Sequence, residues 1–331
     1  MFDSGLINRE GSHLAVALKG LAAFGGSVAV LCGGGAASAH DIEAVAPAED
    51  AGRGSFFGDY SAGIEYDSNV AVLDIDASST QSDFAAQFDL GVGYEYEFSD
   101  RTRAEVSYNF GQDLQFDVTE FSTQLHRGEA KLAHEVGDVT LGASYQLIYS
   151  RLDGAGFLRF HRFTPSIAGY AANKKIYWRG AYIYTDKNFI GRSDRDGEMH
   201  AGAIDAFYFL NGLKTYIIAG YRFEAEDTLA PEFDFDAHNF KFRFVQRVAL
   251  TSRPSKLRLG FRYENRNYSS ITPSIGEIRD DVRYRVESTF ETPINDTFCT
   301  ELRARYDILN SNLPSVDFSQ AVVSVRLGGR F

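Results

Sequence analysis

Apolar and polar residues alternate along most of the chain. The clearest stretch is residues 83–98, where Phe, Ala, Leu, Val and Tyr at even positions alternate mostly with Asp, Gln, Gly and Glu at odd positions. A β-strand turns successive side chains to opposite faces, so this alternation predicts a strand with one apolar and one polar face. The predicted strand is longer than most strands of soluble sheets and long enough to cross a bilayer while tilted.

The same alternation recurs and predicts fourteen strands. Pro165 lies inside one of them and is expected to break its ladder locally, because proline has no N–H to donate. The predicted strands cover 58–66, 84–98, 103–110, 127–132, 139–149, 163–169, 176–184, 204–210, 217–223, 240–250, 257–263, 282–290, 298–308 and 319–331.

The predicted connections alternate between short turns and longer polar loops. The short turns are 99–100, 137–138, 211–212, 253–254 and 293–295, and most of the other connections are long, including charged stretches at 186–197 and 224–236. Bacterial transmembrane barrels have an even strand number, short periplasmic turns and long external loops. The sequence therefore predicts an all-β fold, a single antiparallel transmembrane barrel over residues 58–331 with both termini periplasmic. A soluble β-sandwich or β-solenoid is the alternative.

The last predicted strand has a terminal aromatic residue. Phe331 shares its parity with Ala321, Val323, Val325, Leu327 and Gly329. This stretch resembles the C-terminal strand of bacterial outer-membrane β-barrels, whose final aromatic is read by the barrel-assembly machinery. The resemblance implies that Phe331 is an assembly signal, that the barrel-assembly machinery and outer-membrane lipids are partners, and that the protein resides in the bacterial outer membrane.

A second, local resemblance covers residues 65–70, which read E-Y-D-S-N-V. This segment resembles the opening of several porin-like barrel families and of the barrel domain of surface lipoprotein assembly modifiers. The first resemblance implies a channel and the second implies export. The assembly modifiers usually carry helical repeats before the barrel, where this chain has only residues 40–57, so the channel is the favoured interpretation.

Residues 1–39 are expected to be a secretory signal peptide. Arg9 and Lys19 supply positive charge, residues 21–32 are mostly apolar, and Ala37-Ser38-Ala39 is a small-residue cleavage site. Residues 40–57 are then expected to be a flexible periplasmic segment before the barrel.

The composition excludes several function classes. The 331 residues carry a formal net charge of -12, which argues against nucleic-acid binding, since that requires a basic surface. The two cysteines, Cys32 and Cys299, give no disulfide framework because Cys32 lies in the predicted leader. The sequence leaves the oligomeric state open.

The polar parity of the predicted strands is densely charged, which indicates a wet lumen because buried charges need partners or water. Acidic residues dominate the first three strands and arginines dominate strands ten to thirteen. The predicted pore-lining residues are Asp89, Glu95, Glu105, Arg243, Arg247, Arg258, Arg262, Arg283, Arg285, Arg303 and Arg305. We expect passive diffusion of small polar or anionic solutes, because arginine binds carboxylate and phosphate groups through a planar fork. Cross-strand ion pairs that only brace the wall are the alternative use of these charges. An export barrel and a structural or adhesive surface barrel are the alternative functions.

No catalytic arrangement stands out. Gly197 and His200 match the G-x-x-H of outer-membrane phospholipases, but the Ser-Asn-Gly of that family does not follow. The acidic stretches 194–198 and 232–236 are oxygen-rich enough for calcium, although solvated loop charges explain them as well. We expect no enzyme activity, no cofactor and no metal.

Overall fold

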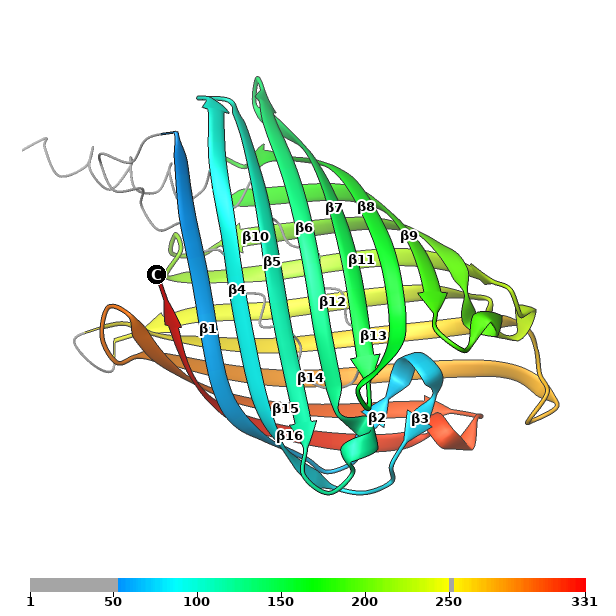
Figure 1. Ribbon diagram of the computed structural model, residues 1–331. Helices are drawn as coiled ribbons and strands as arrows, with labels where there is room; N and C mark the ends of the chain where they lie inside the picture. The colour runs from blue at the N-terminus through cyan, green and yellow to red at the C-terminus, as the bar shows by residue number, and fades with distance from the viewer. Residues whose placement is uncertain (1–52, 250–252) are drawn as a thin grey trace, which may run out of the picture.

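The computed structural model describes residues 53–249 and 253–331, which form a closed barrel of fourteen antiparallel strands (Figure 1). The predicted leader and most of the predicted periplasmic segment lie outside these residues. The barrel strands are β1 (Gly54–Asp67), β4 (Asp83–Ser99), β5 (Thr102–Gln115), β6 (Thr123–Val136), β7 (Val139–Leu152), β8 (Ala155–Ala171), β9 (Ile176–Phe189), β10 (Gly197–Phe209), β11 (Thr215–Thr228), β12 (Phe235–Val248), β13 (Ser255–Thr272), β14 (Glu277–Pro293), β15 (Phe298–Ser311) and β16 (Phe318–Arg330).

Each barrel strand pairs with its neighbours along the chain, and β1 closes the ring by pairing with both β4 and β16. The ladder between β1 and β4 extends to Gly54 opposite Tyr96, so the barrel begins before the predicted Gly58. At the seam, Gly58 and Phe331 exchange backbone hydrogen bonds of 2.9 and 3.0 Å. The predicted closing strand therefore pairs with the first strand up to the terminal Phe331.

The outer face carries the predicted apolar parity. Phe88, Ile204 and Val325 are 45%, 55% and 56% exposed, and apolar side chains of the same parity stand exposed on every barrel strand. Exposed apolar patches of this extent are not stable in water and mark contact with a membrane or a partner. The alternation thus gives the barrel an apolar exterior.

The connections fall into two sets at opposite ends of the barrel. One end holds the start of β1, the end of β16 and short connections such as 100–101 and 137–138, although two further short connections, 153–154 and 273–276, lie at the other end. The other end, which we call the long-loop end, holds β2 (Ala71–Val72), β3 (Ala77–Ser78) and the short 3-10 helices. These helices are η1 (Leu73–Ile75), η2 (Thr119–Phe121), η3 (Ser193–Arg195), η4 (Pro231–Phe233) and η5 (Pro314–Val316). No helix of the described residues is long and apolar enough to cross a membrane.

Two stretches predicted as charged loops belong largely to strands. β9 continues to Phe189 and β11 continues to Thr228, so the predicted loops 186–197 and 224–236 shrink to 190–196 and 229–234. The charges of these stretches are compatible with strands because the inner wall pairs some of them. Lys187 Nζ lies 2.5 Å from Glu226 Oε2, and both side chains are mostly buried.

The expected disturbance at Pro165 is local. The ladder between β8 and β9 pairs Phe163 with Tyr184 and resumes at Ser166 with Ala181, so it omits residues 164 and 165 without a change of register. The strand itself continues through the proline.

The inner face is not uniformly polar. An apolar cluster of Ala168, Tyr177, Phe209, Tyr216, Ile218 and Val245 is buried on β8 to β12. These residues have the parity opposite to the exposed apolar set, so the sequence analysis, which assigned apolar residues to the outside, missed them.

Candidate functional site

The predicted site residues lie on the inner face of the wall. Arg258, Arg285, Arg303 and Arg305 are each less than a tenth exposed. Ion pairs that skip a strand show that these side chains meet inside the barrel: Arg258 reaches Glu301 at 2.8 Å, from β13 to β15. The other predicted residues, Asp89, Glu95, Glu105, Arg243, Arg247, Arg262 and Arg283, share this parity on their strands.

One level of the inner wall carries a row of cations. Strand pairing places Asp205, Gly220, Lys241, Arg262, Arg285 and Asp307 directly beside one another on six consecutive strands, β10 to β15. We call Lys241, Arg262 and Arg285 the basic row. Side chains directly opposite on neighbouring strands have Cβ atoms about 5 Å apart, and like charges there repel. The basic row therefore concentrates three positive charges on the inner wall.

The two outer members of the basic row are each held by an acid. Lys241 Nζ lies 2.7 Å from Asp205 Oδ1, and it reaches that carboxylate across Gly220, which has no side chain to intervene. Arg285 makes a two-pronged contact with Asp307, with Nε–Oδ1 at 2.5 Å and a second nitrogen 3.1 Å from Oδ2. These ion pairs draw the two charges away from the centre of the row.

Arg262, in the centre of the row, has no ion pair within the described part of the chain. Arg283 also has no ion pair among the described residues. It lies next to Arg285 on the same face of β14 and directly opposite Glu264, but the Glu264 carboxylate binds Arg266 at 3.0 Å. Both arginines are half-buried. Neither guanidinium group forms an ion pair among the described residues; Arg262 lies between the paired cations Lys241 and Arg285, and Arg283 lies beside Arg285.

Most other arginines of the inner wall brace it. Glu287 binds Arg243 at 3.1 Å across Gly260 and Arg303 at 3.5 Å, and Arg305 lies 2.9 Å from Asp307. The two expected uses of the charges therefore divide between residues: many form cross-strand ion pairs, whereas Arg262 and Arg283 do not.

The acidic and basic sides of the wall adjoin at one edge. The strand order at the seam is β4, β1, β16, β15. Only β16 therefore separates the acidic strands β1 and β4 from the arginines of β15. Arg326 of β16, which was not among the predicted residues, binds Asp89 at 2.7 Å and Gln87 at 2.9 Å. The expected acidic and basic walls therefore neutralise each other in part at this seam.

The connection between β1 and β4, residues 68–82, folds over the long-loop end, and we call it the mouth loop (Figure 1). Its Val72 and Ile75 are buried in an apolar cluster with Ile148, Leu158 and Phe160 of β7 and β8. Its Asp76 binds Arg195 of η3 at 2.6 Å and Arg279 of β14 at 2.9 Å. Contacts with such widely separated parts of the ring hold the loop across the mouth.

Asp76 is kept ionised by its partners. Burial alone would raise the pKa of its carboxyl group, but the hydrogen bonds and charges of Arg279 and Arg195 outweigh this effect and lower the pKa below the ordinary value. The residue ends η1 in the left-handed conformation, with φ of 54°. No sequence pattern predicts this cluster of Asp76, Arg195 and Arg279, because its members are far apart in the chain.

The other candidate chemistries find no support in the geometry. His200 lies on the outer face, where its Nδ1 is 2.5 Å from the Tyr182 hydroxyl, so it is an ordinary wall residue. Within residues 53–249 and 253–331, no group of three or more His, Cys, Asp or Glu side chains could hold a metal ion.

A closed antiparallel barrel with an apolar exterior and a charged interior has the architecture of bacterial outer-membrane barrels. The chain is structurally similar to an anion-selective porin from Comamonas acidovorans, with a TM-score of 0.51, 8% identity, and coverage of 84% of this chain and 99% of the porin. It is also similar to OmpT, an outer-membrane protein of Vibrio cholerae, with a TM-score of 0.53, 10% identity, and coverage of 85% and 99%.

A third similar structure is Salmonella typhi OmpF in complex with daunomycin, with a TM-score of 0.50, 10% identity, and coverage of 84% of this chain and 97% of OmpF. No family model matches the sequence, and no curated protein matches it. The predicted outer-membrane barrel resemblance is therefore confirmed at the level of the fold, with similarity to porins.

Proposed function

We propose that this protein is a passive diffusion channel of the bacterial outer membrane, with its long-loop end outside and both termini in the periplasm. The fold supports a pore, because a fourteen-strand barrel is wider than the eight-strand barrels that side chains fill. The charged inner wall supports passage of polar solutes, since it offers hydrogen bonds and charge in place of water.

We further propose that the preferred solutes are small anions carrying carboxylate or phosphate groups. The observation that carries this proposal is Arg262, which lies between Lys241 and Arg285 and forms no salt bridge among the described residues. An anion beside Arg262 would relieve the repulsion within the basic row. The planar guanidinium fork matches the two oxygens of a carboxylate or phosphate.

The mouth loop would set the size limit of this channel. Two arginines hold the loop at Asp76, and apolar packing holds it at Val72 and Ile75. While these contacts are made, the loop would narrow the entrance of the channel. A polymer would have to displace this loop, whereas a small solute would pass beside it. This arrangement favours diffusion of small solutes over export.

The test is the ion selectivity of the refolded protein in a planar bilayer. We expect the double variant Arg262→Glu and Arg283→Glu to move the reversal potential in a salt gradient toward cations. Arg262→Glu places a carboxylate between Lys241 and Arg285, whereas Arg283→Glu places one beside Arg285 but opposite Glu264, so heat modifiability must confirm that the double variant is folded. Arg101→Glu, at an exposed turn outside the lumen, is the control for the same change of charge at a single position and should have a small effect. Unchanged selectivity of a conducting double variant would show that these arginines do not contact the permeating ions.

A further inference from the structure

Four tyrosine–histidine pairs stand on the outer face at the long-loop end. They occur once in each of the hairpins β5–β6, β7–β8, β9–β10 and β11–β12, always with tyrosine before the loop and histidine after it. The hydroxyl-to-Nδ1 distances are 2.7 Å for Tyr108–His126, 2.5 Å for Tyr145–His161, 2.5 Å for Tyr182–His200 and 2.8 Å for Tyr221–His238. Such repetition on successive hairpins marks one level of the barrel.

On the histidine-bearing strands, this level lies between apolar and charged outward residues. Toward the middle of the barrel, the next outward residues include Phe163 and Phe240, which are 46% and 49% exposed. Toward the loops, the next outward residues on the histidine strands include Arg159 and Glu198, whereas on the tyrosine strands the apolar Leu147 and Phe223 come first. Side chains that combine an aromatic ring with a polar tip gather at the headgroup level of membranes. The four pairs therefore place the headgroups of the surrounding lipid.

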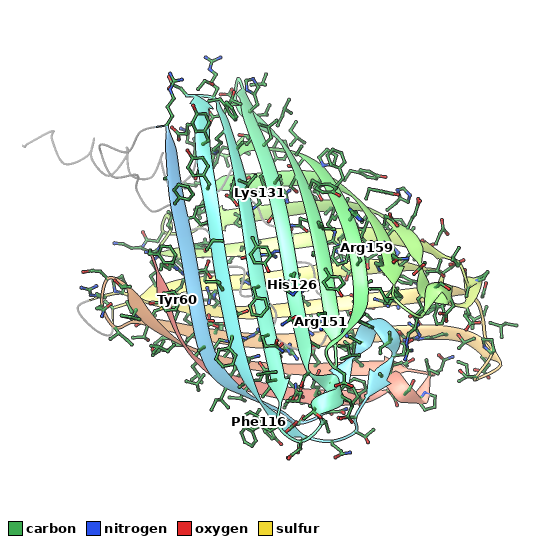
Figure 2. All side chains as sticks on the ribbon, in the orientation of Figure 1. Tyr60, Phe116, His126, Lys131, Arg151 and Arg159 are labelled. Carbon is green, nitrogen blue, oxygen red and sulfur yellow. The ribbon has the colours of Figure 1, made fainter. Side chains whose placement is uncertain are left out.

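The charged outward residues are basic on one side of the barrel. We define the rim patch as His126, Arg151, Arg159 and His161, on the outer face of β6, β7 and β8. Figure 2 labels the first three of these residues. His126, Tyr149 and Arg159 are directly opposite one another on these three strands. Each of these three side chains carries a hydrogen-bond donor.

The cations of the rim patch have only neutral partners in the described part of the chain. Arg151 donates to the Gln124 side chain at 3.1 Å and to the Gly154 carbonyl, and Arg159 donates to Asn188 at 3.4 Å. His126 Nε2 lies 3.2 Å from the Gln124 oxygen, which requires a proton on that nitrogen. A half-buried and an exposed arginine without acidic partners, next to an apolar surface, are suited to an anionic group that has apolar chains.

The surrounding acids direct that anion to β6–β8. Asp186 lies directly opposite His161 on β9. Further along the same rim, β10, β11 and β12 present Glu198, Asp227 and Asp236 on the outer face. Anions are repelled from this acidic side and attracted to the rim patch.

We propose that the rim patch binds the phosphate groups of a membrane lipid in the leaflet at the long-loop end. The Arg151 and Arg159 guanidinium groups take the phosphate oxygens, and the acyl chains lie on the apolar face below Phe163. The tyrosine hydroxyls hold the imidazole rings through Nδ1 and so orient Nε2 at the headgroup level. With the orientation proposed above, this leaflet is the outer one, and its phosphorylated lipid is of the lipid A type.

The test measures lipid binding to the purified barrel in a neutral detergent. Diphosphorylated lipid A is titrated against the wild type and against the double variant Arg151→Gln and Arg159→Gln, and bound lipid is counted by native mass spectrometry. We expect about tenfold weaker binding in the double variant, with part of the loss recovered when both arginines are replaced by lysine. Dephosphorylated lipid A should bind the wild type as weakly as the phosphorylated lipid binds the double variant.

Two controls decide the outcome. Arg101→Gln, which removes an exposed arginine at the opposite end of the barrel, should leave lipid binding unchanged. Heat modifiability of each variant reports that the barrel is folded. Undiminished lipid binding by the folded double variant would overturn the proposal. Competition by inorganic phosphate at the concentration at which the lipid binds would show a free-phosphate site instead and would also overturn it. Neither result bears on the channel, since the rim patch lies outside the lumen.

Discussion

The mouth loop should be released by a single substitution, Asp76→Asn. The change removes the charge that binds Arg195 at 2.6 Å and Arg279 at 2.9 Å but keeps the size of the side chain. Asparagine also tolerates the left-handed backbone at this position, where φ is 54°. The substitution therefore tests the two ion pairs without straining η1.

The magnitude follows from the contacts of Asp76. Its side chain is 11% exposed, and the partner side chains of Arg195 and Arg279 are 16% and 4% exposed, so solvent screens these pairs only in part. Hydrogen bonds to charged groups contribute about 1.5–3 kcal/mol each. Arg279 keeps Asp281 at 2.7 Å, which limits its own loss. We expect the closed loop to lose about 2–4 kcal/mol, or roughly 30-fold to several hundredfold in its ratio to the open loop.

Hydrogen exchange of the loop amides measures this change. The amide of Val70 donates to Gln81 at 3.0 Å and that of Ser79 donates to Val70 at 2.8 Å, so both are protected while the loop is closed. They should exchange faster in Asp76→Asn and should be unchanged in Glu120→Gln, an exposed residue of the neighbouring connection. Equal protection of the loop in wild type and Asp76→Asn would refute the role of these ion pairs.

The pH dependence of the loop has a defined sign. Because the folded pKa of Asp76 is lowered, its stabilising effect is fully present above the ordinary value of 3.8 and is lost as pH falls through the folded pKa. Loop protection should therefore be constant between about pH 5 and 8 and should fall only below about pH 4. A loop that opens between pH 7 and 5 would contradict this assignment.

Three further predictions concern assembly, packing and orientation. Phe331→Asp should block insertion, because the terminal residue pairs with Gly58 at the seam; normal amounts of heat-modifiable barrel in outer-membrane fractions would contradict this. Gly260→Ala should lower the thermal stability and Gly180→Ala should not, since an added Cβ would stand 2.7 Å from Glu287 Cγ at the first site and 3.8 Å from Ile167 at the second; equal melting temperatures would refute this reasoning. A cysteine at Asn69 should react with an impermeant reagent on intact cells and one at Asp100 should not; the reverse labelling would invert the proposed orientation.

The outer wall was predictable because its signal is local. Each lipid-facing residue is separated from the next by one inward residue, so the alternation in 84–98 or 319–331 is visible without knowledge of the rest of the chain. The strand ends were less visible. β9 and β11 continue through charged residues, because Lys187 of β9 and Glu226 of β11 form an ion pair inside the barrel. The two residues are 39 positions apart in the sequence.

The inner wall was predictable as a set of residues but not as a site. The sequence placed Arg262 and Arg285 on the polar parity, yet their environments differ, because Arg285 faces Asp307 on β15 and Arg262 faces cations on both sides. Only the register of several strands reveals this difference. The contact between Asp76 and Arg279 joins residues 203 positions apart, and no periodic pattern predicts it.

The most direct test of the proposed function is the reversal potential of the wild-type protein, refolded and inserted into a planar bilayer with a tenfold gradient of potassium chloride. The basic row with its unpaired Arg262 predicts steady conductance and a reversal potential of the sign set by chloride, despite the net charge of -12. A reversal potential of the sign set by potassium would contradict the anion preference. Inserted barrels that conduct at no voltage would contradict the channel itself.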